Sequence, residues 1–225
     1  MVVTRVKVRT VTSLMCLTRE VMRDDGELDR IIEQGVKNNK TMESELVARG
    51  FEVQSLRIST NSFEDYLSID DDHKFAQELE LIRNTLSRHG ANFFNFGPAR
   101  SAIGLSRVPS LLESMELAFA SCDLLPSQSL DEIDLAWMGK VADCCSTLAD
   151  GGSNNFRFCA FANAPHGIPF FPVSYHKSGS PPSFSIALEN AELVREVFSN
   201  EPHDEATRVQ TCMQSLKHEL ELVTL

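Results

Sequence analysis

Strand-like and helix-like hydrophobic patterns alternate along the N-terminal half of the chain, and this order limits the possible folds more than any other feature. Residues 4–12 alternate in period two and are rich in Val and Thr, which is typical of a half-buried strand. Residues 28–46 carry apolar side chains near helical spacing, and Gly50 follows them as a common helix stop. We therefore predict a strand followed by a long amphipathic helix.

The same pattern then repeats. Residues 51–60 (FEVQSLRIST) alternate again, residues 75–86 carry one apolar helical face, and residues 91–99 (ANFFNFGPA) favour a third strand. The three consecutive acidic residues at 70–72 are more typical of a helix N-cap than of a cation site. Parallel neighbours cannot be joined by tight turns, so this order predicts an α/β fold with a parallel sheet and right-handed crossovers.

The C-terminal half is less regular. Two helices are expected between Pro109 and Leu148, one carrying Leu112, Met115 and Phe119 and the other carrying Trp137. Three strand-like runs are expected at 155–163, 168–176 and 183–189, followed by helices near 190–199 and 203–222. The sequence indicates neither an internal repeat nor a low-complexity linker. We therefore expect one α/β domain over residues 1–225.

The charge balance excludes several classes of partner. The chain has 32 acidic and 21 basic residues and a formal net charge of -11, which opposes binding to nucleic acid and to anionic membrane surfaces. An apolar stretch of about 20 residues, as a membrane span needs, is absent from the sequence, as is a signal-peptide core. The 6 cysteines show no metal-ligand spacing and are interpreted as free buried thiols. A cytoplasmic protein without a metal, nucleic-acid or membrane partner is expected.

Residues 154–192 form the most distinctive part of the sequence. They contain an FRF strand, an Asn–Pro turn, a PFFP-x-x-YH segment and a strand that ends in Glu. This segment resembles the DUF711 family, which is also called UPF0210. Weaker similarity covers the first strand, the EVQSLRIST run and the NFGPA turn, so the resemblance extends over nearly the whole chain. The matching positions are 156–158, Asn163 with Pro165, 169–172 with Tyr175 and His176, and 186–189.

The resemblance implies a fold related to the barrel of glycyl-radical enzymes, in chains about twice as long as this one. It predicts a parallel-sheet half-barrel with flanking helices. Radical chemistry is not expected, because Cys144 and Cys145 lie in a helical pattern and no glycine follows Gly179 to form a radical loop. The last residues keep a helical pattern without a Gly or Pro cap, as expected of a chain that continues. A half-barrel exposes sheet edges and an inner face, so we expect an identical copy or a partner chain to cover it.

Polar residues of the predicted strands and turns form a candidate ligand site. In α/β sheets such residues converge at one end of the strands. Arg157 is the expected ligand for a carboxylate or phosphate, His176 the acid or base, and Glu189 the residue that orients His176 or binds a cation. Structural roles compete with this interpretation: an Arg–Glu pair, a turn asparagine and a Tyr–His packing pair. The predicted catalytic residues are His176 and Glu189, and the predicted ligand-binding residues are Arg157, Asn163 and Tyr175.

Two functions remain open at the level of sequence. His166 lies in the APHGIP turn and is expected to be exposed rather than catalytic. Neither a phosphate-binding glycine loop nor a GxSxG motif is present in the sequence, so nucleotide hydrolysis and esterase chemistry are not expected. The first hypothesis is a non-radical isomerase, lyase or cyclase acting on a small anionic metabolite, with its cofactor unknown. The alternative is a catalytically silent module that senses a small molecule or completes a barrel with a partner.

Overall fold

The computed structural model describes residues 6–125, 134–149, 153–200 and 204–223. Strands and helices alternate along most of this length, as the sequence pattern predicts. The elements are β1 (Lys7–Met15), η1 (Val21–Arg23), α1 (Asp25–Ala48), β2 (Leu56–Thr60), η2 (Phe63–Asp65), α2 (Asp72–Arg88), β3 (Phe93–Ala99), α3 (Ala102–Ser114), β4 (Ala118–Asp123), α4 (Leu135–Ala149), η4 (Ser153–Phe156), β5 (Phe158–Phe161), β6 (Ser183–Glu189), α5 (Ala191–Asn200) and α6 (Glu205–Val223).

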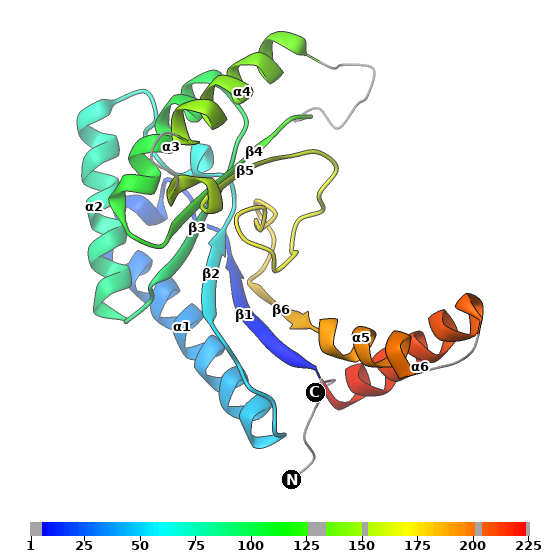
Figure 1. Ribbon diagram of the computed structural model, residues 1–225. Helices are drawn as coiled ribbons and strands as arrows, with labels where there is room; N and C mark the ends of the chain where they lie inside the picture. Colours follow the sequence, from blue (N-terminus) through cyan, green and yellow to red (C-terminus); the bar gives the residue numbers. More distant parts are fainter. Residues whose placement is uncertain (1–5, 126–133, 150–152, 201–203, 224–225) are drawn as a thin grey trace.

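The described strands form one curled sheet in the order β5-β4-β3-β2-β1-β6. Strands β1 to β5 are parallel and follow one another in chain order, whereas β6 is antiparallel to β1. Because successive right-handed crossovers all step in the same direction, helices α1 to α4 lie on one face of the sheet (Figure 1). The predicted fold class, a mostly parallel half-barrel with flanking helices, is confirmed. The antiparallel edge strand β6 is a feature that the pattern did not predict.

The main hydrophobic core lies between the sheet and these helices. Phe94 and Phe96 of β3 are fully buried there and meet edge to face, with ring centroids 4.8 Å apart. Helices α1 and α2 begin at acidic side chains that cap them. Asp24 accepts hydrogen bonds from the main-chain N–H groups at the start of α1, and Asp71 accepts one at the start of α2. The prediction of an N-cap within residues 70–72 is confirmed.

The concave face of the sheet carries polar side chains and is covered by residues 162–182, named the covering segment below (Figure 1). Ser59 Oγ donates to the Ser174 carbonyl at 3.0 Å. Asn95 Nδ2 donates to the same carbonyl at 2.9 Å, and the main-chain N–H of His176 donates to the Thr60 carbonyl at 3.0 Å. These bonds come from β2 and β3, so they hold the covering segment against the middle of the sheet.

Two predictions for the C-terminal half are wrong. Phe119 is predicted to lie in a helix. In the structure α3 ends at Ser114, and Phe119 lies in β4. The small, buried residues of β4 have neither β-branching nor period-two alternation, since both faces of this strand are covered. Residues 168–176, predicted as a strand, form an irregular part of the covering segment. Its prolines lack the N–H group that a strand ladder needs.

The remaining features follow the sequence more closely. Helices α5 and α6 pack on each other and project from the end of β6 (Figure 1). Every cysteine is free, and Cys144 and Cys145 pack against the core from α4, as the helical pattern predicts. Burial raises the pKa of the Cys144 thiol to about 11, which keeps it protonated at neutral pH. Among the described residues no helix has the length and apolar character that crossing a bilayer requires.

Candidate functional site

A cavity lies at the carboxyl ends of β4 and β5, where ligands bind in many α/β proteins. Its volume is about 380 Å³. The strand β4 contributes its last residue, Asp123, and the remaining lining follows β4 or belongs to the covering segment. We call it the carboxyl-end cavity; its lining residues are Asp123, Leu125, Asn163, Ala164, Pro165, His166 and Tyr175.

Asp123 is the acidic group of this cavity. Its Oδ1 accepts a hydrogen bond from the main-chain N–H of Leu125 at 2.9 Å, and its carbonyl accepts one from Trp137 Nε1 at 3.0 Å. Burial raises the pKa of Asp123, and the Leu125 hydrogen bond and the charge of Arg100 only partly oppose this effect. The carboxyl group therefore holds a proton more tightly than an exposed aspartate does.

Tyr175 forms another wall of the cavity. Its ring stacks on Phe161 with centroids 5.7 Å apart, and its hydroxyl donates to the Ala164 carbonyl at 3.0 Å. Burial raises the pKa of Tyr175, and the negative charge of Asp123 raises it further, so the phenol remains a neutral donor. Asn163 adopts a left-handed backbone with φ 55°, a conformation that Asn tolerates better than most residues. Tyr175 thus fixes the turn that presents Asn163 to the cavity.

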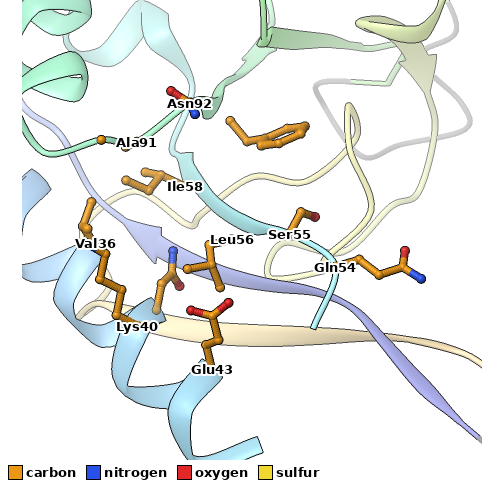
Figure 2. Close-up of a pocket in the computed structure, with 12 residues that line it drawn as sticks. Val36, Lys40, Glu43, Gln54, Ser55, Leu56, Ile58, Ala91 and Asn92 are labelled. Atoms are coloured by element: carbon orange, nitrogen blue, oxygen red, sulfur yellow. The ribbon is translucent and has the colours of Figure 1, made fainter. Parts of the chain in front are cut away.

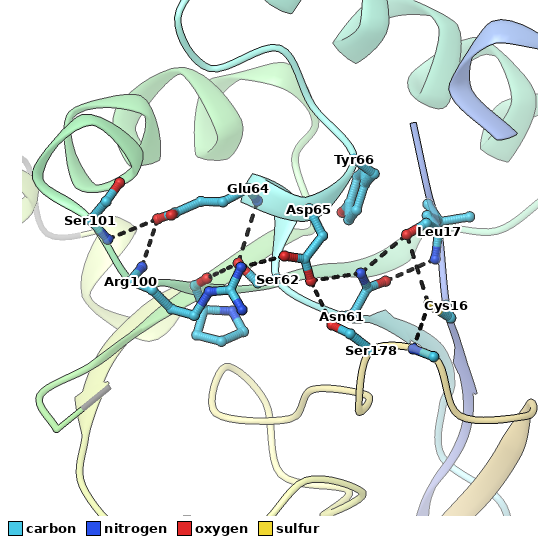
Figure 3. Close-up of polar contacts among 12 residues, drawn as sticks. Cys16, Leu17, Asn61, Ser62, Glu64, Asp65, Tyr66, Arg100, Ser101 and Ser178 are labelled. Atoms are coloured by element: carbon cyan, nitrogen blue, oxygen red, sulfur yellow. Dashed lines mark hydrogen bonds and ion pairs between the residues drawn. The ribbon is translucent and has the colours of Figure 1, made fainter. Parts of the chain in front are cut away.

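A polar network lies at the same edge of the sheet, after the carboxyl ends of β1, β2 and β3 (Figure 3). Asp65 accepts hydrogen bonds from Ser178 Oγ, from Asn61 Nδ2 at 3.1 Å and from the Arg100 guanidinium. Burial alone would raise the pKa of Asp65, but these hydrogen bonds and the Arg100 charge outweigh it, and the pKa lies below its usual value. Asp65 and Asp123 are therefore shifted in opposite directions, an arrangement that in enzymes separates an ionised carboxylate from a proton-holding one.

The network also fixes the loop that follows β3. Glu64 Oε1 accepts from the main-chain N–H of Arg100 at 2.6 Å and of Ser101 at 3.0 Å. Asn61 bonds both main-chain groups of Leu17, its Oδ1 at 2.8 Å and its Nδ2 at 3.1 Å (Figure 3). Arg100 is thus held between the two carboxylates of η2. Among the described residues no three metal-ligating side chains come together.

Three of the predicted site residues lie at this end of the sheet. They are Asn163, Tyr175 and His176. Asn163 and Tyr175 line the carboxyl-end cavity. His166, which was not among the predicted site residues, also lines this cavity and is exposed, as predicted. His176 is buried in the covering segment, and its Nε2 lies 3.2 Å from the Ser180 carbonyl. Because a carbonyl only accepts, Nε2 is the donor. The side chain of His176 therefore closes a turn of the covering segment.

The other two predicted residues lie at the opposite end, so the expected convergence of all five is corrected. Arg157 precedes β5, and its guanidinium donates to the carbonyls of Leu112, Met115 and Glu116 at the end of α3. Glu189 pairs in register with Lys7 at the start of β1 and forms an exposed ion pair with Arg9 at 2.8 Å. Glu189 cannot orient His176 in this arrangement. The reason is the antiparallel direction of β6, which places its last residue beside the first residue of β1.

The contacts of Arg157 predict a structural role for it. Replacing Arg157 by Met is expected to lower the free energy of unfolding by about 2 kcal/mol, because carbonyls at the end of α3 lose a charged donor. Urea denaturation followed by circular dichroism measures this loss. Arg30→Met, which removes only an exposed ion pair within α1, is the control and should leave the stability almost unchanged. Equal stability of the two variants would contradict the structural role.

A second cavity, of about 280 Å³, lies between α1 and the amino ends of β2 and β3 (Figure 2). Figure 2 shows Lys40 and Glu43 of α1 on one side and Gln54 and Ser55 on the other. Asn39 is its buried polar group, and it is already satisfied by Ser13 Oγ at 2.8 Å and the Arg57 carbonyl at 2.8 Å. With its buried polar group paired and its place at the amino ends of the strands, this cavity is a weaker candidate than the carboxyl-end cavity.

The acidic residues of the site were not found from the sequence. Asp123 is the last residue of β4, part of which is predicted as a helix, and the signal that could have identified it is a carboxylate directly after a short buried run. Asp65 and Arg100 lie just after β2 and β3, both of which were predicted. Ligands bind at the carboxyl ends of parallel strands, and this rule would have identified Asp65 and Arg100 as candidate site residues.

The fold and the site together define an α/β half-barrel protein with a polar cavity at the carboxyl ends of its strands. Residues 1–224 match the family described as uncharacterised ACR (DUF711), and the chain belongs to this family, as the resemblance predicts. A UPF0210 protein of Pyrobaculum aerophilum is 24% identical over 206 residues, which cover 88% of this chain and 46% of that relative. The chain thus spans about half the length of the curated relative that it matches.

Proposed function

We propose that this DUF711 protein is a non-radical isomerase, lyase or cyclase for a small anionic metabolite, with Asp123 as the general acid or base. The raised pKa of Asp123, inside a cavity at the carboxyl ends of the strands, is the observation that supports this role. Asp65, at the same edge of the sheet and with a lowered pKa, remains ionised when Asp123 takes up a proton. Two carboxyl groups whose pKa values are shifted apart are the arrangement that acid–base catalysis uses.

The other cavity residues receive supporting roles in this proposal. The amide of Asn163 and the ring of His166 supply hydrogen-bond donors for an anionic substrate. Tyr175 positions the turn that carries them through its bond to Ala164. His176, predicted as the acid or base, is assigned to holding the covering segment instead. The proposal does not use Glu189, because it lies at the opposite end of the sheet.

Deuterium incorporation tests the role of Asp123. The full chain is incubated in heavy water with a panel of small carboxylic acids that carry a C–H bond beside a carbonyl, and mass spectrometry measures exchange. We expect exchange with at least one acid, and a loss of about a hundredfold or more in Asp123→Asn. Asn retains an oxygen that can accept the Leu125 hydrogen bond, so the fold is preserved. Unchanged exchange in this variant would exclude Asp123 as the proton-transfer group.

A stability measurement on the same variant separates lost chemistry from lost folding. The folded pKa of Asp123 lies above its usual value of 3.8, so its stabilising contribution is complete below that pH and is lost as pH rises through the folded pKa. At neutral pH the buried carboxylate is therefore unfavourable. Asp123→Asn should have a Tm at pH 7 equal to or above that of the wild type, and a smaller decrease of Tm between acidic and neutral pH.

A second candidate function is a catalytically silent module that completes a barrel with an identical copy or a partner chain. Within the described residues, β5 and β6 each pair on one side only, and Phe184 on β6 is 52% exposed. Native mass spectrometry of the sample used for exchange distinguishes the two functions. An assembly with a bound small molecule but without exchange supports the silent module, whereas exchange that depends on Asp123 supports the enzyme.

A further inference from the structure

Arg57 lies on the concave face of the sheet, away from the carboxyl-end cavity. Its neighbour Ile58 packs into the main core, so alternation along β2 directs Arg57 to the opposite face. The guanidinium carbon lies 5.2 Å from the ring centroid of Phe93 on β3 and 4.9 Å from that of Phe171 in the covering segment. Two aromatic rings from different parts of the chain therefore hold the guanidinium group in one place.

The hydrogen-bond donors of this guanidinium are mostly unused. Arg57 Nε donates to Ser55 Oγ at 3.0 Å. Within the described part of the chain, neither terminal nitrogen of Arg57 has a carboxylate or carbonyl partner, although the residue remains partly exposed. The rings lie over the guanidinium, so its terminal nitrogens remain as a pair of donors in the guanidinium plane. Such a pair matches the two oxygens of a carboxylate.

Arg107 is a second arginine that stacks on an aromatic ring, and its donors are paired. Arg107 also stacks on an aromatic ring, that of Phe75 at 5.0 Å, but it donates to the Ile69 carbonyl at 2.8 Å and pairs with Asp72 at 2.6 Å. The chain has 32 acidic residues against 21 basic ones, so acidic partners are not scarce. The charge that acts on Arg57 is instead the like charge of Arg9. Burial and then Arg9 lower the pKa of Arg57.

We propose that Arg57 is the receptor for a carboxylate group of a small molecule on the concave face of the sheet. The carboxylate binds in the plane of the guanidinium, at the terminal nitrogens of Arg57. Both oxygens of a carboxylate lie in the guanidinium plane, whereas a tetrahedral phosphate also has oxygens outside this plane, where the stacked rings lie. Binding also supplies the opposite charge that a half-buried arginine beside another arginine lacks.

This site is separate from the carboxyl-end cavity. Arg57 pairs in register with Phe93 at the start of β3, whereas the cavity residue Asp123 follows Cys122, which pairs with Ala99 at the end of β3. At the rise of a strand, the two ends of β3 are roughly 20 Å apart. The carboxylate site therefore stands independently of the proposed chemistry of Asp123.

Side-chain NMR of the full chain tests this site. In protein labelled with ¹⁵N, the Nε–Hε signal of Arg57 is followed during titration with succinate and, as the neutral analogue, succinamide, at constant ionic strength. We expect a saturable shift with succinate and none with succinamide. Arg57→Met lacks this signal, so its titration is followed through the main-chain amide signals, and it should weaken succinate binding by about tenfold to a hundredfold. Arg107→Met, which removes a stacked but already paired arginine, should bind succinate as the wild type does.

Two further variants keep the result interpretable. Arg57→Lys retains the charge and the long side chain but loses the paired donors, so it should fold normally and still bind succinate more weakly than the wild type. Asp123→Asn should bind succinate unchanged. The proposal is overturned if the Arg57 signal does not respond to succinate, if Arg57→Met binds as tightly as the wild type, or if inorganic phosphate binds more tightly than succinate.

Discussion

Replacing Gly97 by alanine is expected to lower the free energy of unfolding by about 3 kcal/mol or more. Gly97 lies in β3 with φ 78°, a left-handed conformation that is unfavourable for a residue with a Cβ atom. An added Cβ would stand 2.4 Å from the carbonyl oxygen of Asn61 and 3.0 Å from the main-chain nitrogen of Ser62. Both contacts are to main chain, so relief requires β2 and β3 to move apart at the candidate site.

Gly90 provides a matched control for the Gly97 variant. It also has a left-handed backbone, with φ 68°, but an added Cβ meets nothing within 4 Å. Gly90→Ala should therefore cost only the conformational strain, about 1 to 2 kcal/mol. Urea denaturation of both variants gives the two losses, and their difference isolates the close approach of β3 to Asn61. Equal losses would show that the main chain at Asn61 adjusts without cost.

The glycine has a functional consequence as well. The loop that begins at Asn61 carries Glu64 and Asp65, and both carboxylates bind groups of Arg100 directly after β3. A larger residue at position 97 would therefore move Glu64 and Asp65 away from Arg100. The sequence already marked the NFGPA turn as a compact feature, but only the neighbouring main chain explains why glycine is needed there.

The sequence predicted the parallel α/β sheet because local patterns carry that information, whereas the half-barrel was implied by the family resemblance. Strands that alternate in period two and helices with one apolar face appear directly in the order of residues, and right-handed crossovers then place the helices on one face. The strand β4 was missed because a strand covered on both faces has no alternation to read. Its small residues, Ala118 to Cys122, are equally compatible with a helix.

The candidate site was harder to predict because it depends on strand direction. Residues 168–176 and 183–189 are both predicted as strands, and the polar residues of the predicted strands and turns are expected to converge at one end of the sheet. Under those assumptions Arg157, His176 and Glu189 share one end of the sheet. In the structure, β6 runs antiparallel, and the covering segment crosses the concave face, which separates Glu189 from His176. Residue types predicted the polar character of this region, whereas topology decides which residues meet.

The polar side chains of the inner face attach the covering segment to the sheet. An inner face with Ser59 and Asn95 would bind water in an open half-barrel, but here both side chains bond the main chain of residues 172–174. The same segment places Tyr175 in the carboxyl-end cavity and Phe171 against Arg57. Both proposed sites therefore depend on how firmly this segment is attached to the sheet.

Asn95→Leu is expected to lower the free energy of unfolding by about 3 kcal/mol and to release the covering segment. Asn95 is fully buried, and its Nδ2 donates to the carbonyls of Pro172 at 2.7 Å and Ser174 at 2.9 Å. Its Oδ1 accepts from the main-chain N–H of Gly97 at 3.0 Å. Leucine has a similar size but no donor or acceptor, so these main-chain groups lose their partner in the interior.

Ser59→Ala is the graded control, because it removes a single hydrogen bond to the Ser174 carbonyl. Its expected cost is about 1 kcal/mol. Urea denaturation measures both losses, and amide hydrogen exchange reports how often residues 162–182 open. Faster exchange confined to this segment in Asn95→Leu would show that the segment opens separately from the sheet, whereas faster exchange throughout would show one cooperative unit. If Asn95→Leu has the stability and the exchange rates of the wild type, then Asn95 does not hold the covering segment on the sheet. Other contacts would then have to hold Tyr175 and Phe171 in place.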